Sequence, residues 1–486
     1  MPSSIALAAA IAVASTALGQ VPALPSPRPL LDSLGQANDA AGTATAVFGD
    51  VALVGARGAD AGASNAGKVC VFRRADGAWS ASGALAEPVP SAGAQFGTAV
   101  ALTAQFAFAT AVASDGNGRL HVFPRSGTSF GTPLPLASPN RTAGDRFGDR
   151  IAADGAWLAV GAPARAGRGA VDLFRAEGSQ WTFVSTLTPP TDDQGQLFGR
   201  GVSLRGTTLA IGMPGDSSLG PEAGAVDVFE LSAGTWNRSA TLRAPEGSAH
   251  DLFGASVAID GSIAAIGAYR DDGGVADSGS AYVFRRIGGS WSFTQKLLPE
   301  NALLDADFGY AVAISGNRLA IGAPAAVIGG SRRGTTYVLE DGASGFVPRL
   351  RVGAPASAAG AFAGTSVSLD GATLLSGAPL DTTVAQYAGA CGAVDLAVDC
   401  DSNGQPDAVA LALGAADLNG DGIPDTCQCP GDFTNDGITN GSDLGILLGF
   451  WGTNASTLPK VDIDRSGRVD GADLGLLLGN WGPCGG

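Results

Sequence analysis

The sequence predicts an all-β fold, a seven-bladed β-propeller, followed by a small calcium-loop segment and a small α-helical domain. Three observations support the propeller. One unit recurs seven times along most of the chain, each copy contains four short runs of alternating residue type, and Gly (73) and Pro (27) are frequent among the 486 residues. Ordinary proteins contain roughly 7% Gly and 5% Pro. A small, apolar and turn-rich composition is typical of many short strands.

The repeat is clearest in the copy that starts at Phe253. Its four runs are Phe253–Ile259, Ser262–Ala268, Gly279–Phe284 and Trp291–Leu297. The same unit starts at Phe96, Phe147, Phe198 and Phe308, and degenerate copies start at Ala41 and Ala363, so the spacing is 51 or 55 residues. Period-two alternation indicates strands with one face toward each neighbouring layer. Four antiparallel strands repeated seven times, without a helical period, predict a closed propeller.

The first two strands of each copy are expected to meet at a tight turn. Asp154-Gly155, Asp260-Gly261 and Asp370-Gly371 separate these strands in three copies. Asp-Gly suits a two-residue hairpin, because Gly tolerates the positive φ that the turn requires.

Closure of the ring is also predicted from the sequence. The seventh copy stops after Gly392–Leu396 and lacks its fourth strand, whereas Pro29–Ser33 precedes the first copy where such a strand should stand. We therefore predict that Pro29–Ser33 pairs into blade seven and latches the ring.

The opening Phe-Gly and the Gly-Ala-Pro after the second strand (161–163, 322–324 and 377–379) resemble FG-GAP repeats. Such repeats form the integrin α-subunit propeller and occur in many bacterial secreted proteins. The resemblance covers residues 29–398. Integrin-type blades often carry an Asp-rich calcium loop between the first two strands, but only a two-residue turn stands there in this chain. Calcium binding is therefore not expected in the propeller.

Residues 1–19 are predicted to be a signal peptide. Ile5–Leu18 is apolar and uncharged, and Ala17-Leu18-Gly19 places small residues where signal peptidase reads them. No other apolar run approaches the ~18 residues needed to span a bilayer. The protein is therefore expected to be secreted, extracellular or in the cell envelope, without a membrane span. Its net charge of −16 argues against a nucleic-acid partner, which would need a basic face.

From residue 399 onward the chain is acidic, with 13 Asp, no Glu and three basic residues in 399–486. Two copies of one loop fill residues 399–428, and each has oxygen-bearing side chains at alternate positions beside a Gly, a pattern that wraps a hard cation. The predicted ligands are Asp399, Asp401, Asn403 and Asp407 in the first copy and Asp417, Asn419, Asp421 and Asp425 in the second. The pair resembles thrombospondin type 3 calcium repeats.

Two longer loops, 30 residues apart, follow in 429–486. They place oxygen ligands at positions 1, 3, 5, 9 and 12 and Gly at position 6, as EF-hand loops do. The ligands are Asp432, Thr434, Asp436, Asn440 and Asp443 in one loop and Asp462, Asp464, Ser466, Asp470 and Asp473 in the other. Each loop leads into Leu-Gly-x-Leu-Leu-Gly-x-Trp-Gly, whose Leu and Trp residues share one helical face.

These duplicated loop–helix units resemble the type I dockerin module, which implies a cohesin-like or cell-surface scaffold partner. The sequence departs from the dockerin pattern at two ligand positions, because Thr434 at position 3 and Ser466 at position 5 are neutral and therefore weaker ligands. Another departure concerns partner recognition, because positions 10 and 11 hold Gly441-Ser442 and Gly471-Ala472 in place of the usual hydroxyl pairs. About four Ca²⁺ ions are expected, all in the tail.

Six cysteines together with an export signal fit an oxidising compartment. Each thrombospondin-like loop has lost one half of a cysteine pair, which suggests a Cys400–Cys427 bridge. Cys429 and Cys484 flank the dockerin-like module and are expected to clasp its ends. Cys70 and Cys391 fall in blades one and seven, which are neighbours in a closed ring, and a Cys70–Cys391 bridge is the third predicted pair.

Motifs for catalysis are missing from the sequence. It has no phosphate loop, no Gly-x-Ser-x-Gly elbow and no Cys-x-x-Cys, and its two histidines, His121 and His250, are far apart. Asp271, Asp272 and Asp277 share one loop, and a carboxylate pair at the channel mouth remains open, since propellers can host such sites.

We therefore expect a secreted, non-catalytic, calcium-binding interaction or adhesion-type protein rather than an enzyme. Its propeller would bind an unknown protein or glycan, and its tail would dock to the scaffold. Two alternatives remain, a secreted polysaccharide-active enzyme with a catalytic propeller and a structural envelope protein.

Overall fold

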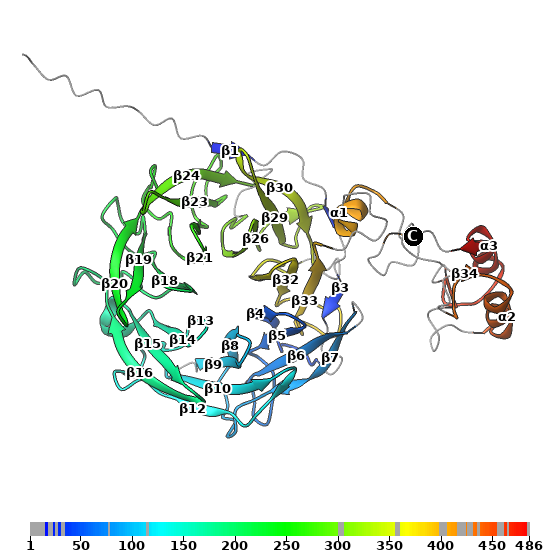
Figure 1. Cartoon of the computed structure of the whole chain (residues 1–486), viewed down its shortest axis with the longest axis horizontal. Helices are drawn as coiled ribbons and strands as arrows, with labels where there is room; N and C mark the ends of the chain where they lie inside the picture. Colours follow the sequence, from blue (N-terminus) through cyan, green and yellow to red (C-terminus); the bar gives the residue numbers. More distant parts are fainter. Residues whose placement is uncertain are drawn as a thin grey trace, which may run out of the picture.

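Seven sheets stand in a ring around a central channel in the computed structural model of the chain (Figure 1). The structure describes residues 15–17, 23–24, 28–30, 35–75, 78–112, 116–299, 306–354, 360–397, 406–415, 424, 431–434, 438–453, 461–463 and 466–483. Each sheet is a mainly antiparallel blade whose strands follow one another from the channel to the rim. The predicted seven-bladed all-β propeller is thereby confirmed.

The blades follow the sequence repeat. Blade one holds β4 (Ala41–Phe48), β5 (Val51–Ala56), β6 (Lys68–Ala75) and β7 (Ala78–Leu85), and blade two holds β8 (Phe96–Leu102), β9 (Phe106–Val112), β10 (Gly118–Ser126), β11 (Ser129–Phe130) and β12 (Leu134–Leu136). Blade three holds β13 (Arg150–Asp154), β14 (Trp157–Ala162), β15 (Ala170–Glu177) and β16 (Gln180–Leu187), and blade four holds β17 (Gly201–Arg205), β18 (Thr208–Met213), β19 (Ala225–Ser232) and β20 (Thr235–Leu242). Blade five holds β21 (Ser256–Asp260), β22 (Ile263–Ala268), β23 (Ser280–Ile287) and β24 (Ser290–Leu298), and blade six holds β25 (Ala311–Ser315), β26 (Arg318–Ala323), β29 (Thr335–Gly342) and β30 (Gly345–Val352), with a hairpin of β27 (Val327–Ile328) and β28 (Ser331–Arg332). Blade seven holds β31 (Ser366–Asp370), β32 (Thr373–Ala378) and β33 (Ala390–Asp395).

The fourth strand of blade seven comes from the N-terminal segment. β3 (Arg28–Leu30) pairs antiparallel with β33, with Leu30 opposite Cys391, and Leu30 is 2% exposed. The predicted latch is thus confirmed at its first described residues, while residues 31–33 of the predicted segment lie outside the described part. Two further pieces, β1 (Ser15–Ala17) and β2 (Ala23–Leu24), lie parallel to the rim strands β24 and β30.

The second strand of each blade is the most buried. Every residue of β5, β9, β14, β18, β22 and β32 is buried. These strands read as continuous runs of small and apolar residues because both faces pack, one against each adjacent blade. The core is therefore a series of layers between blades rather than one central cluster.

Adjacent blades are joined by a repeated contact between a Gly and the Phe that opens the next copy. Gly224 forms a parallel bridge with Phe253, and Gly67, Gly169 and Gly279 do the same with Phe96, Phe198 and Phe308. Gly224 has φ +86°, and a Cβ added there would stand 2.1 Å from the Phe253 carbonyl oxygen. The recurring Phe-Gly signature thus reflects blade-to-blade packing.

We expect the Gly224→Ala variant to unfold at clearly lower urea concentration than the Gly206→Ala variant. Gly206 also has positive φ (+57°), but open space surrounds its added Cβ. Both variants pay backbone strain of about 1–2 kcal/mol, and Gly224→Ala adds an overpacking cost of about 1–3 kcal/mol. Urea denaturation followed by fluorescence gives both free energies of unfolding, and equal losses would contradict the packing role.

The Asp-Gly turns differ from the sequence prediction by one residue. Asp154 is still paired with Trp157, so that the two-residue turn is Gly155-Ala156. Gly155 supplies the positive φ (+54°), whereas Asp154 accepts a hydrogen bond from Gly206 N of the next blade at 2.6 Å. Asp260 and Asp370 accept from Gly316 N and Gly49 N in the same way. The Asp therefore links neighbouring blades, and only the Gly shapes the turn.

The predicted Cys70–Cys391 bridge is wrong in this structure. The two residues do lie in one buried cluster between blades one and seven, as ring closure requires. Both are thiols, however, and Cys391 Sγ donates to the Gly392 carbonyl. Burial raises the pKa of Cys391 to about 12, so this thiol resists the ionisation that oxidation needs.

The tail holds three short helices in its described part, α1 (Asp407–Ala412), α2 (Gly441–Gly449) and α3 (Gly471–Gly479). Ala408 of α1 packs in the cluster that contains Leu350 and Val394 of blades six and seven. Among the described helices, none has both the length and the apolar character needed to cross a membrane.

Candidate functional site

The first two predicted calcium loops lie largely outside the described residues. Of their ligands, Asp407 is described, and it stands buried in the first turn of α1, where a helix N-terminus stabilises negative charge. Outside the described part are Asp399, Asp401, Asn403, Asp417, Asn419, Asp421 and Asp425, together with Cys400, Cys427, Cys429 and Cys484. These loops and the bridges Cys400–Cys427 and Cys429–Cys484 stay predictions.

The third loop brings three of its predicted ligands together. Thr434 Oγ1 lies 3.2 Å from Asp432 Oδ1 and 3.1 Å from Asp443 Oδ1. Asp443 is fully buried and also accepts hydrogen bonds from the main-chain N–H groups of Phe433, Thr434 and Asn440. Burial alone would raise the pKa of Asp443, but these donors outweigh it and hold the pKa below its usual value. Loop positions 1, 3 and 12 therefore converge around an ionised carboxylate.

The fourth loop repeats part of this arrangement. Asp462 Oδ2 accepts from Gly467 N at 2.8 Å, so that the first ligand position closes onto the Gly of position 6. Asp470 and Asp473 form a capping box at the start of α3, as Asn440 and Asp443 do for α2. Ser466 donates to the Arg468 carbonyl, and Asp436 and Asp464 lie outside the described residues.

Capping explains part of the loop pattern without metal. Positions 9 and 12 of each loop serve as N-cap and N3 of the following helix, a role that favours Asn and Asp there. In the described part of the chain, no three His, Cys, Asp or Glu side chains gather as a metal site. The oxygen-only chemistry of positions 1, 3 and 12 is nevertheless the donor set that calcium prefers.

The two loop–helix units of the tail pack with approximate two-fold symmetry. β34 (Ile438–Thr439) of the first unit pairs with β35 (Gly482–Pro483) at the end of the second. In return, Val469 of the second unit exchanges main-chain hydrogen bonds with Gly452 and Thr453 at the end of the first. The shared core includes Leu447, Val461, Ile463, Val469 and Leu477.

Each unit leaves the same large apolar pair exposed. Leu448 and Trp451 are 52% and 46% exposed, and the matching Leu478 and Trp481 are 52% and 49% exposed. A Cβ added at Gly445 or Gly475 would meet no atom within 4 Å, so these glycines face outward on the helices. The predicted Leu and Trp face of each helix is thus divided, because Leu447 and Leu477 enter the core while the Leu and Trp pairs stay accessible.

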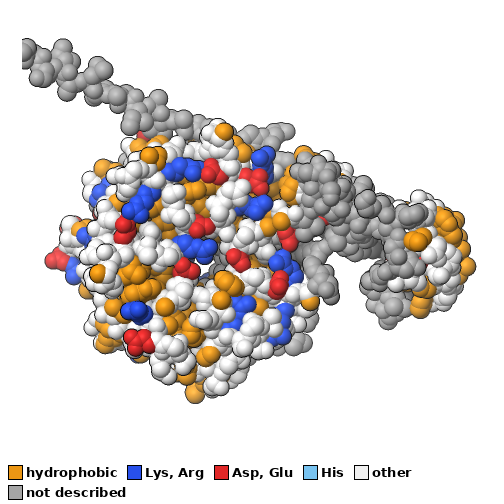
Figure 2. Space-filling view, in the orientation of Figure 1, with side chains coloured by type: hydrophobic (Ala, Val, Ile, Leu, Met, Phe, Trp, Pro, Cys, Tyr) orange, Lys and Arg blue, Asp and Glu red, His pale blue; other side chains and the backbone are white. Residues whose placement is uncertain are grey.

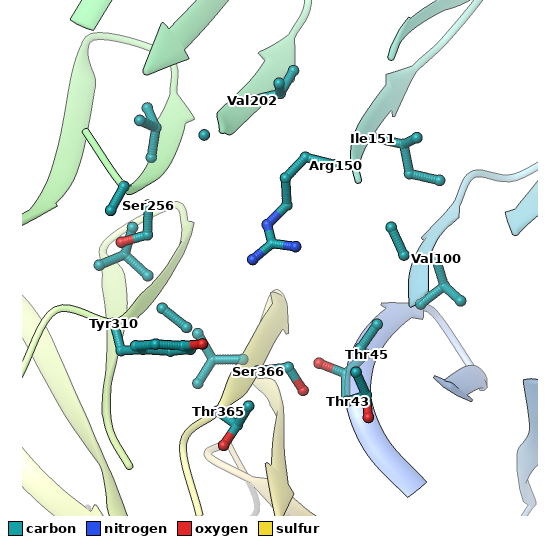
Figure 3. A pocket seen from close by; sticks show the side chains of 18 of the residues that line it. Thr43, Thr45, Val100, Arg150, Ile151, Val202, Ser256, Tyr310, Thr365 and Ser366 are labelled. Atoms are coloured by element: carbon teal, nitrogen blue, oxygen red, sulfur yellow. The ribbon is translucent and has the colours of Figure 1, made fainter. Parts of the chain in front are cut away.

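The central channel holds a second candidate site, which the sequence did not single out. A cavity of about 200 Å³ is lined by the first strands of all seven blades, and the Arg150 guanidinium projects toward its centre (Figure 3). Figure 2, which views the ring from the side opposite to Figure 3, shows a narrow opening at the middle of the ring with basic and acidic side chains beside it. The described residues that line this cavity include no Asp or Glu.

Three arginines surround one buried carboxylate beside this cavity. Asp149 is 2% exposed, and it lies 2.5 Å from Arg146 Nη2, 3.8 Å from Arg200 Nη1 and 4.0 Å from Arg150 Nη1. Burial would raise the pKa of Asp149, but Arg150, Arg200 and Arg146 outweigh it and hold the pKa below its usual value. Repulsion from Arg200, followed by burial, lowers the pKa of Arg150 to about 10. Positive charge is thus in local excess.

Alignment of the repeats could have revealed this cluster. The residue after each Phe-Gly or Ala-Gly stands at the same place in the repeat, and in successive copies it is Thr43, Thr98, Asp149, Arg200, Ala255, Tyr310 and Thr365. Only Asp149 and Arg200 are charged at this position, and they belong to adjacent copies. The charged residues therefore lie on one side of the ring.

The other candidates from the sequence have structural surroundings. His121 is buried 3.8 Å from Glu87, and burial lowers its pKa, while His250 is exposed beside Glu222. Asp271 is buried and accepts hydrogen bonds from Lys296 Nζ at 3.0 Å and from the Tyr282 hydroxyl. Asp272 accepts from Asp277 N within the loop. These acids therefore do not form a carboxylate pair over the channel.

Comparison with known families agrees with the repeat. Residues 181–229, 236–284 and 291–339 each match the FG-GAP repeat family. No curated protein matches the chain significantly. Each matched segment begins in the outer strand of one blade (β16, β20 or β24) and ends in the third strand of the next (β19, β23 or β29). Each matched FG-GAP segment thus straddles two blades, and residues 181–339 of the seven-bladed propeller contain three FG-GAP repeats.

Proposed function

We propose that this protein is a secreted, non-catalytic binding protein of the adhesion type. An FG-GAP propeller is a fold suited to protein interaction. In this function the propeller binds a protein or glycan ligand, and the calcium-ordered tail docks to a cohesin-like or surface scaffold partner. The observation that carries the docking role is the exposed Leu and Trp pair, present once on each of two matching helices.

Export would leave the propeller closed. The predicted signal peptide, residues 1–19, includes β1, which lies outside the four strands of blade five. Its removal would therefore expose the rim of β24 but keep β3, the strand that closes blade seven. The latch lies in the mature chain, as a secreted propeller requires.

Calcium would order the tail loops by neutralising their carboxylates. The converging oxygens of Asp432, Thr434 and Asp443 support this role. Because the metal binds the folded loops, it would stabilise the tail by mass action. The polysaccharide-active alternative gains no support from the channel, since a general acid needs a raised pKa and Asp149 has a lowered one.

Calorimetric titration of the mature chain with calcium is expected to show about four sites. An Asp432→Asn, Asp462→Asn double variant should lose the two dockerin-like sites, because position 1 of each loop loses its charged ligand. The matched control is Asp277→Asn, which removes an exposed acid from a propeller loop and should leave the titration unchanged. A chain that takes up no calcium, or a double variant that binds it as before, would contradict the proposal.

The docking surface is tested on the same chain. A Trp451→Ser, Trp481→Ser variant should keep the calcium heats but lose calcium-dependent binding to a type I cohesin domain. If the variant still binds cohesin, the two Trp residues are not the docking surface. If the unaltered, calcium-loaded chain does not bind cohesin, the proposal of a cohesin-like partner is wrong.

A further inference from the structure

We propose that the channel mouth at Arg150 binds the carboxylate of a saccharide acid. This inference deepens the proposed function, on which it rests for the propeller as a ligand-binding domain. It assigns Arg150 as the cation that contacts the ligand and the surrounding hydroxyl groups as its other partners.

The charge of the site favours an anion. Arg150 donates from Nη1 to the Asp149 carbonyl at 2.9 Å and lies 4.0 Å from the Asp149 carboxylate, and 39% of its side chain is exposed. Arg200 Nη1 is buried and makes no hydrogen bond to the described part of the chain. One carboxylate thus serves three guanidinium groups. Because Arg150 lines the cavity, a ligand carboxylate in the channel could pair with its guanidinium in the paired geometry that arginine prefers and offset this excess of positive charge.

The two ends of the channel differ in charge, which fixes where an anion would bind. The opposite end carries Asp154, Asp260 and Asp370, whose carboxylates accept hydrogen bonds from turn N–H groups. Its arginine, Arg205, is already near Asp260 (3.3 Å) and Asp154 (3.9 Å). An anion entering that end would meet acids, whereas at the Arg150 end it meets an excess of arginines.

The hydroxyl groups around Arg150 favour a ligand that is rich in hydrogen-bond donors. Thr43, Thr98 and Thr365 each donate to a main-chain carbonyl at 2.7 Å, and Ser256 and Ser366 donate at 2.7 and 2.8 Å. Since each hydroxyl has one hydrogen, these five oxygens can only accept further hydrogen bonds. A simple carboxylate has no donors to offer, whereas the hydroxyl groups of a saccharide acid can donate to this ring.

The size and shape of the site agree with one sugar unit. The cavity of about 200 Å³ is smaller than the ~300–1,000 Å³ that holds a drug-sized ligand. Tyr310 lies at the wall of this cavity, into which the Arg150 guanidinium projects (Figure 3). An aromatic face beside a guanidinium offers apolar contact to a sugar ring while the carboxylate pairs with the arginine.

Calorimetry with sodium glucuronate, glucose and acetate on the mature chain tests this assignment. We expect one glucuronate site per chain, with glucose and acetate binding at least about tenfold more weakly. Glucose lacks the carboxylate that forms charged hydrogen bonds with Arg150, and acetate lacks the hydroxyl groups that donate to the ring of hydroxyl oxygens. Arg150→Met should weaken glucuronate binding about tenfold or more. The control is Arg205→Met, which removes the arginine at the opposite end of the channel and should leave the affinity unchanged.

Each contrary result overturns a defined part of the inference. If the unaltered chain binds glucose and glucuronate equally well, the channel has no anion site. This comparison does not depend on the folding of any variant. Acetate binding as tightly as glucuronate, or tighter binding of the free carboxylate of acetyl-alanine, would overturn the assignment to a saccharide. Glucuronate affinity that survives Arg150→Met in a folded variant would overturn the role of Arg150. Loss of the tail calcium sites leaves these titrations unchanged, so failure here and failure of the docking proposal can be told apart.

Discussion

Deleting residues 20–35 is expected to lower the melting temperature of the mature protein by roughly 5–10 °C. The deletion removes β3, which supplies the outer strand of blade seven, and it removes the buried Leu30 from the cluster between blades one and seven. Burial of one Leu contributes about 1.5–3 kcal/mol, and each strand hydrogen bond adds about 0.5–1.5 kcal/mol. At about 2–4 °C per kcal/mol for a large domain, these losses give the stated shift. Differential scanning calorimetry measures it.

A shorter deletion provides the control for the latch. Removing residues 20–27 takes away β2, which adds only to the rim of β30 in blade six, and keeps β3. We expect a much smaller shift for this variant. If both deletions lower the melting temperature equally, the stabilisation comes from the N-terminal segment in general and the latch is not its cause. Leu30→Asp, which keeps the chain length, should reproduce most of the larger shift.

Asp172→Ala is expected to cost about 3–5 kcal/mol of stability, because it strips a buried arginine of its main partner. Asp172 is fully buried in blade three and accepts from Arg165 Nη1 at 2.8 and 2.9 Å and from Thr186 Oγ1 at 2.6 Å. Arg165 also lies 3.0 Å from Asp145. Burial opposes the charge of Arg165, but Asp172 and Asp145 outweigh it and raise its pKa above the usual value. Without Asp172, Asp145 alone would neutralise the Arg165 guanidinium, whose side chain is only 8% exposed to water.

The control is an exposed Asp–Arg pair. Asp192 forms an ion pair with Arg168, and its side chain is 91% exposed. Exposed pairs contribute about 0–1 kcal/mol, so Asp192→Ala should change stability little. Urea denaturation of both variants gives the comparison. The double variant Asp172→Ala, Arg165→Met should regain part of the loss, since it also removes the buried charge. A double variant as unstable as the single one would show that packing, rather than the unpaired arginine, carries the cost.

Much of the fold could be predicted because its signals are local. Seven copies of one unit determined the number of blades, since each copy supplies four strands and a ring must close on itself. The missing fourth strand in the last copy predicted that an N-terminal segment would complete it, and β3 does so. The dipeptide Asp-Gly predicted a two-residue turn, which follows from the positive φ that Gly155 permits.

Contacts between blades were decided only by the tertiary structure. Asp154 belongs to the turn by sequence, yet it bonds to Gly206 N in the next blade, because the ring brings equivalent turns side by side. Arg200 comes from the repeat that follows the one containing Asp149 and Arg150, and the three side chains meet only where the first strands converge on the channel. Ring closure also placed Cys70 and Cys391 in one buried cluster without joining them. Periodicity along the chain thus determines the strands and their number. Which charged side chains and thiols become neighbours is determined only by the closed ring, because it brings residues of different blades together.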